Sequence, residues 1–179
     1  MATRREVLQG LIISLGGASA LSACGGVANV LATRPGMPTR FYTTAELGLV
    51  SRISDLIIPR TETPGALDVN VPGYLDGLMS DWANDETRQE HRQALDTIDD
   101  ELALLARGDF RTVADAAAES ALIRLDGDAF NGNGELAGYR RLKGYITNAY
   151  FATEEGAIEE LKWVAVPGRW DPAVDISRG

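Results

Sequence analysis

Cysteine and histidine are almost absent from this chain, which has one of each among its 179 residues. A single cysteine excludes an internal disulfide and any thiolate cluster for zinc or iron–sulfur binding. A single histidine excludes a multi-histidine metal site, and it leaves His91 as the one residue that a Ser-His-Asp or Cys-His arrangement could use. We expect His91 to be an ordinary helical residue, partly buried or at the surface, one turn before Leu95.

Basic residues are scarce relative to acidic ones, since 17 Lys and Arg stand against 26 Asp and Glu and give a formal net charge of −9. A chain of this charge repels phosphate backbones, so nucleic acid is disfavoured as a partner. The carboxylates gather in residues 99–101 and 154–160, where we expect solvated helix surfaces, because neighbouring helical positions point in different directions. The hydrophobic content of 45% is enough to build one core.

Several cofactor motifs are missing as well. No Gly-x-Gly-x-x-Gly follows a predicted strand, and no Cys-x-x-Cys-His is present for haem attachment. Residues 126–135 are rich in Asp, Asn and Gly, but their spacing does not match the EF-hand template, and we expect a turn over this stretch. We therefore predict no catalytic, cofactor or metal site in this chain.

The first 24 residues have the layout of an export signal. Arg4 and Arg5 precede an apolar stretch that carries no charge until Arg34, and paired arginines are typical of the twin-arginine type. Val7 and Gln9 stand where Phe and Lys are commoner. The alternative is a short buried helix, which the Gly and Ser content disfavours.

Cys24 ends this stretch, and residues 21–24 resemble a lipobox, in which the cysteine receives a lipid and becomes the mature N-terminus. Cleavage after residues 18–20 is the alternative, and it would leave Cys24 as a free thiol. The twin-arginine route moves proteins that are already folded, which a helical domain without a cofactor hardly needs. The signal therefore suggests that this chain escorts a cofactor-bearing partner.

The mature chain is predicted to be all-α, a single domain over residues 41–179 of about five to six helices with ordered loops, after a flexible tether over residues 25–40. Apolar residues recur at helical spacing, and a capping box at residues 43–46 marks the first helix. The helices are expected at about 44–58, 72–84, 85–107, 114–125, 136–150 and 157–161. Strand alternation is missing, which disfavours a sheet.

Three stretches together resemble the gluconate 2-dehydrogenase subunit 3 family, the small subunits of membrane-bound, flavin-dependent sugar and sugar-acid dehydrogenases. They are residues 56–66, residues 71–76 with Trp82, and residues 149–157 leading to 166–170. The resemblance spans about residues 41–175, and the first stretch is the most specific.

The resemblance implies a non-catalytic subunit of a larger complex. In such a complex a large FAD-containing flavoprotein of the glucose-methanol-choline oxidoreductase type oxidises the substrate, and a cytochrome c subunit with haem c often takes the electrons. The small subunit would help the flavoprotein to mature and to cross the membrane through the twin-arginine translocase. We expect it in the periplasm, held at the membrane through a lipid on Cys24.

The candidate partner contacts are residues of two rigid, proline-containing loops, because such loops lose little entropy on docking. They are Pro59, Thr61, Pro64, Gly65, Pro167, Gly168 and Trp170. The alternative is that these residues only fix loops inside the domain. Two other functions stay open from the sequence, an independent periplasmic lipoprotein with a structural role and a small hydrolase that uses His91.

Overall fold

The computed structural model describes residues 32–132 and 136–163. The predicted signal, Cys24 and the candidates Pro167, Gly168 and Trp170 lie outside the described residues. The described elements are α3 Thr44–Ile57, α4 Val71–Asp81, α5 Asp85–Ala106, α6 Asp115–Asn131, α7 Ala137–Phe151 and a short π-helix, η1, Glu155–Glu160. Within these ranges there is no strand, which confirms the all-α prediction. None of the described helices is long and apolar enough to cross a membrane.

Helix α3 begins at the predicted capping box. The Thr43 side chain accepts a hydrogen bond from the Glu46 N–H at 3.2 Å, and the Glu46 carboxylate accepts one from the Thr43 N–H at 2.6 Å. The two bonds satisfy backbone donors that the first helical turn leaves unpaired. The helix buries Leu49 and Ile53 and ends two residues before Pro59.

Helix α5 is the longest of the described helices, as predicted, at 22 residues. Its cap is Asn84, whose side-chain oxygen accepts from the Thr87 N–H at 2.8 Å. The helix ends at Ala106, and the next residue, Arg107, adopts a left-handed conformation with φ of 57°. The apolar residues that recur along one face of this helix lie in the core, with Leu95, Ile98 and Leu102 all buried.

Helix α6 continues to Asn131, so the prediction that the helix ends at Leu125 and a turn begins at Asp126 was wrong. The physical reason lies in the partners of Asp126. Its carboxylate accepts hydrogen bonds from the Tyr139 hydroxyl at 2.9 Å and from the Lys143 ammonium at 2.5 Å, both on α7. Since the side chain bonds to another helix, it does not compete for the local backbone, and the helix continues.

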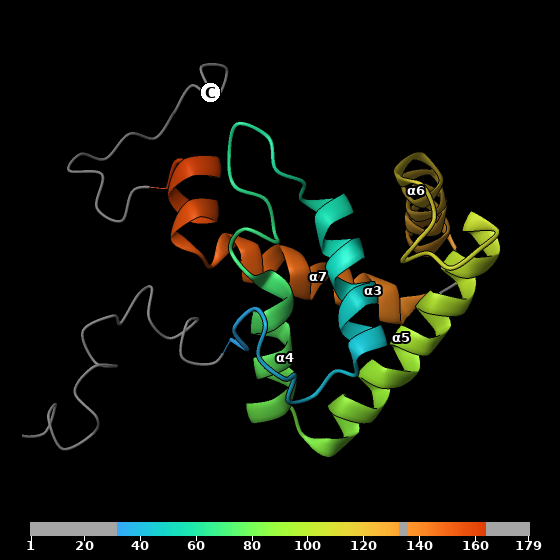
Figure 1. Cartoon of the computed structure of the whole chain (residues 1–179), viewed down its shortest axis with the longest axis horizontal. Helices are drawn as coiled ribbons and strands as arrows, with labels where there is room; N and C mark the ends of the chain where they lie inside the picture. Colours follow the sequence, from blue (N-terminus) through green and yellow to red (C-terminus); the bar gives the residue numbers. More distant parts are fainter. Residues whose placement is uncertain (1–31, 133–135, 164–179) are drawn as a thin grey trace, which may run out of the picture.

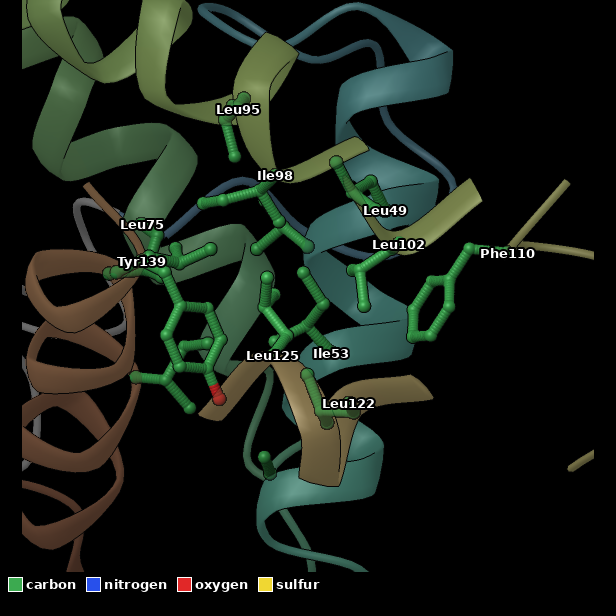
Figure 2. Packing of buried hydrophobic residues seen from close by; sticks show 14 of the residues in the cluster. Leu49, Ile53, Leu75, Leu95, Ile98, Leu102, Phe110, Leu122, Leu125 and Tyr139 are labelled. Atoms are coloured by element: carbon green, nitrogen blue, oxygen red, sulfur yellow. The ribbon is translucent and has the colours of Figure 1, made fainter. Parts of the chain in front are cut away.

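The core lies between the helices, with α5 packed against α6 and α7, α3 against α4, and α4 against α7. Figure 1 shows α7 passing across the molecule behind α3. Figure 2 shows the side chains that meet in the centre, from all five α-helices and the segment after α5. They are Leu49, Ile53, Leu75, Leu95, Ile98, Leu102, Phe110, Leu122, Leu125 and Tyr139.

Candidate partner-binding surface

The loop between α3 and α4 is closed by its own hydrogen bonds. The Ala66 N–H donates to the Ile58 carbonyl at 2.9 Å, which brings the two ends of the loop together. The Gly65 N–H donates to the Asp68 carboxylate at 2.7 Å, and the same carboxylate pairs with Arg60. This segment is therefore an ordered loop, as the two prolines predict.

Gly65 is the residue that allows the close approach inside this loop. A Cβ at this position would lie 2.6 Å from the Arg60 nitrogen and 2.8 Å from the Pro59 carbonyl carbon, both of them backbone atoms. Gly65 is buried and Pro64 is half-buried, whereas Pro59 and Thr61 are exposed. Among the four candidates in this loop, Pro59 and Thr61 are thus the ones whose side chains face outward.

The loop is fixed to the C-terminal part of the domain by two hydrogen bonds. The Tyr150 hydroxyl of α7 donates to the Pro64 carbonyl at 2.7 Å, and the Thr63 hydroxyl donates to the Glu160 carboxylate of η1 at 2.7 Å. Figure 1 shows the loop and η1 at the same end of the molecule. Residues 56–66 and 149–157, which are far apart in the sequence, therefore form one surface.

The stretch at residues 71–76 has a different role, because it holds the segment before α3. The Asp76 carboxylate, fully buried in α4, accepts hydrogen bonds from three consecutive backbone N–H groups, those of Arg40, Phe41 and Tyr42, at 2.8–2.9 Å. It also accepts one from the Thr33 hydroxyl. Burial by itself would raise the pKa of Asp76, but these four hydrogen bonds outweigh burial and hold the pKa below its usual value.

Residues 33–40, the C-terminal half of the predicted tether, are thus attached to α4. Besides the bonds to Asp76, the Thr33 N–H donates to the Gly73 carbonyl at 2.8 Å. The Arg40 guanidinium also contacts both carboxylate oxygens of Asp81 at 2.8 Å. A Cβ on Gly73 would lie 2.2 Å from the Thr33 carbonyl oxygen, so glycine is needed where this segment crosses the helix. The earlier part of the tether, residues 25–31, lies outside the described residues.

His91 is more buried than the sequence suggested, with 6% of its surface exposed. Its Nε2 lies 2.8 Å from the Tyr42 hydroxyl, and the rings of Phe41 and Tyr145 flank it with centroids 6.0 Å away. Burial is the main cause that lowers the pKa of His91 to about 4, and burial also raises the pKa of Tyr42 well above its usual value. The pair is therefore neutral near pH 7, and its position inside the core does not favour the hydrolase alternative.

Within residues 32–132 and 136–163, no group of three or more His, Cys, Asp or Glu side chains is placed to hold a metal ion. The structure adds two residues that the sequence did not single out for a role. Asp76 and Tyr42 receive their roles only when the fold brings residues 33–42 against α4 and α5, and no local pattern in the sequence marks this.

The comparisons with known proteins agree with the resemblance. A family model described as Gluconate 2-dehydrogenase subunit 3 matches residues 44–168, which include the ordered loop, Asp76 and all of the described helices. No curated protein and no solved structure matches the chain.

Proposed function

Because this chain belongs to the gluconate 2-dehydrogenase subunit 3 family and is thereby a subunit of such a dehydrogenase complex, we propose that it is the non-catalytic escort of the complex's flavoprotein. The flavoprotein holds FAD and oxidises a sugar, sugar acid or other alcohol. A cytochrome c subunit with haem c receives the electrons. The small subunit binds the flavoprotein in the cytoplasm, supports its maturation, and carries it through the twin-arginine translocase.

Two features of the N-terminal sequence support this proposal. Arg4 and Arg5 stand before an uncharged apolar stretch, as in signals that direct folded proteins across the membrane. A flavoprotein must fold around its FAD before export, so a signal on the small subunit can serve both chains. Cys24 then offers a lipid attachment site that would hold the complex on the periplasmic face of the membrane. Several acyl chains on one cysteine would hold firmly, whereas a single chain binds only marginally.

The observation that carries the proposal is the family match over residues 44–168 in a chain that also begins with paired arginines. The test is affinity purification of the full chain, tagged at its C-terminus and expressed in its native host. We expect a large flavoprotein to copurify, with FAD released on denaturation in an amount comparable to that of the tagged chain. Recovery of the tagged chain without flavin would contradict the proposal.

A further inference from the structure

The end of the domain that carries η1 has an apolar groove that the core does not use. The groove is lined by side chains from the last turn of α7, from η1 and from the segment after it. They are Phe151, Ala152, Thr153, Glu154, Ala157, Ile158, Leu161 and Trp163. Ile158, Leu161 and Trp163 are 49%, 57% and 58% exposed, and Phe151 is also exposed, whereas the adjacent Tyr150 is buried. Clustered exposed apolar side chains of this kind mark interaction surfaces more often than single ones do.

The groove is held in shape by the geometry of the π-helix. Gly156 is buried, and a Cβ there would lie 2.3 Å from the Tyr150 carbonyl oxygen, so only glycine permits this close turn. The backbone N–H of Trp163 donates to the Ala157 carbonyl at 2.9 Å, which holds the backbone of this residue beside η1, and its side chain lines the groove. Short π-helical turns are often found at functional sites. A surface that is already ordered loses little entropy when a partner binds.

The surface around the groove, here called its rim, is acidic, and Glu154 lines the groove itself. Four glutamates, Glu154, Glu155, Glu159 and Glu160, lie along η1 and immediately before it, and Glu62 is exposed in the adjoining loop. In the described residues of this end, 58–68 and 151–163, the cations are Arg60, which pairs with Asp68, and Lys162. An apolar floor with an acidic rim is complementary to an apolar segment flanked by basic side chains.

We propose that this groove is the docking site for an apolar segment with flanking Lys or Arg residues on the flavoprotein subunit, an inference that rests on the proposed function. The charge of the rim disfavours the other occupants. A second copy of this chain carries a net charge of −9, and an anionic membrane surface is negative as well. Residues 164–179 contain two arginines and two aspartates, so they lack the net positive charge that the rim selects.

The test uses the tagged full chain with the flavoprotein that copurifies with it. Ile158→Ser removes an apolar contact in the groove, and Glu154→Lys with Glu159→Lys cancels the net negative charge of the rim. The matched controls lie on α6, where Ile123→Ser removes another exposed isoleucine and Glu119→Lys with Asp128→Lys makes the same change in net charge. Circular dichroism and thermal unfolding of each variant verify that the domain is folded.

We expect each groove variant to lower the amount of FAD recovered per tagged chain by about tenfold, as hot-spot contacts do, and the α6 controls to keep it. Flavoprotein that binds the groove variants as tightly as the parent chain would overturn this inference and leave the proposed function intact. Absence of flavoprotein from the parent chain itself would instead be a failure of the proposed function.

A second readout follows Trp163 and distinguishes the remaining occupants. Subtracting the fluorescence emission of Trp163→Phe from that of the parent chain gives the emission of Trp163. We expect this emission at the wavelength of a solvated indole in the isolated chain and at a shorter wavelength in the complex. If Trp163 already emits at short wavelength in the isolated chain, the groove is covered without the flavoprotein and the inference is overturned. Light scattering then shows whether a dimer or residues 164–179 cover it.

Discussion

At Asp76 a single carboxylate fixes the segment that precedes the first described helix. Three backbone N–H groups and one hydroxyl point at it, and the side chain is fully buried. Hydrogen bonds to a charged acceptor are about twice as strong as bonds between neutral groups, and a buried carboxylate persists only with such partners. Asp76 therefore links α4 to residues 33–42, and through Tyr42 it supports His91.

Asp76→Asn should lower the free energy of unfolding by about 2–4 kcal/mol, because an amide is uncharged and turns donor hydrogens toward groups that are themselves donors. Denaturant unfolding of the purified chain measures this. The control is Asp81→Asn, which removes the charge of a solvent-accessible partner of Arg40 and should change the free energy of unfolding far less than Asp76→Asn does. Equal losses for the two variants would contradict the role given to Asp76.

The sole histidine makes the stability of the chain depend on pH. The pKa of His91 falls from a usual value of 6.5 to about 4 in the folded chain, so the unfolded chain takes up the proton first as pH falls. The contribution of neutral His91 to the free energy of unfolding is complete above pH 6.5. It is lost as pH falls toward 4, at about 1.4 kcal/mol per pH unit within that window.

His91→Gln removes the titrating group, so the difference in unfolding free energy between the two chains should vary with pH between 6.5 and 5. NMR titration offers a direct check, because one histidine gives one set of imidazole signals. We expect a midpoint near pH 4 in the folded chain. A midpoint near 6.5 would mean that His91 is solvated and that the buried pair with Tyr42 does not form.

These residue-scale features are the least predictable from sequence. His91 was expected to be an ordinary helical residue, partly buried or at the surface. It does lie in a helix, but it is buried, and this burial depends on Phe41 and Tyr42, 49–50 positions earlier in the chain. Asp76 looks like any acidic residue in a helix until the fold places three backbone N–H groups in front of it. Hydrogen bonds between distant segments leave no periodic signal that sequence patterns could detect.

The loop between α3 and α4 is an element whose shape depends on one close backbone approach, at Gly65. Gly65→Ala would force its Cβ against backbone atoms at 2.6–2.9 Å, and backbone cannot yield as a flexible side chain can. We expect this variant to lose about 1–3 kcal/mol of unfolding free energy as the loop opens. Amide hydrogen exchange at Ala66, which bonds to the Ile58 carbonyl, should accelerate.

The control for this substitution is Gly127→Ala in α6, where a Cβ has nothing within 4 Å. Alanine in an open helical position should stabilise the chain by about 0.5–1 kcal/mol, because glycine loses more backbone entropy on folding. The two glycine-to-alanine changes are thus expected to have opposite signs. A stabilising effect of Gly65→Ala would mean that the loop does not need this close approach.

Most of the helices were predictable because their signals are local. The capping box at Thr43, the proline in the first turn of α4 and the stripe at Leu95, Ile98 and Leu102 act within one or two turns of the chain. The end of α6 was not, because Asp126 and Gly127 favour a turn by themselves and the bonds that override this come from α7. The partner roles of Pro59, Thr61, Pro64 and Gly65 stay predictions, although the structure shows which of their side chains face outward.

At the scale of the whole molecule, two of the three stretches that resemble the family lie at one end of the domain. The loop at residues 58–66 and the turn at residues 153–163 adjoin through Tyr150, Thr63 and Glu160. The proposed export signal lies in the N-terminal sequence that precedes the domain. In our account, one part of the chain binds the flavoprotein and another part directs the pair through the translocase.

The measurement that tests this account most directly is the location of the flavoprotein when the paired arginines are changed. Arg4→Lys with Arg5→Lys keeps the charge but removes the feature that the twin-arginine route requires. The matched control, Arg124→Lys with Arg141→Lys, makes the same chemical change within the folded domain. Fractionated cells should show FAD-bound flavoprotein in the periplasm for the parent chain and the control, and in the cytoplasm for the signal variant. Flavoprotein that still reaches the periplasm in full with the signal variant would contradict the proposal that this chain exports it.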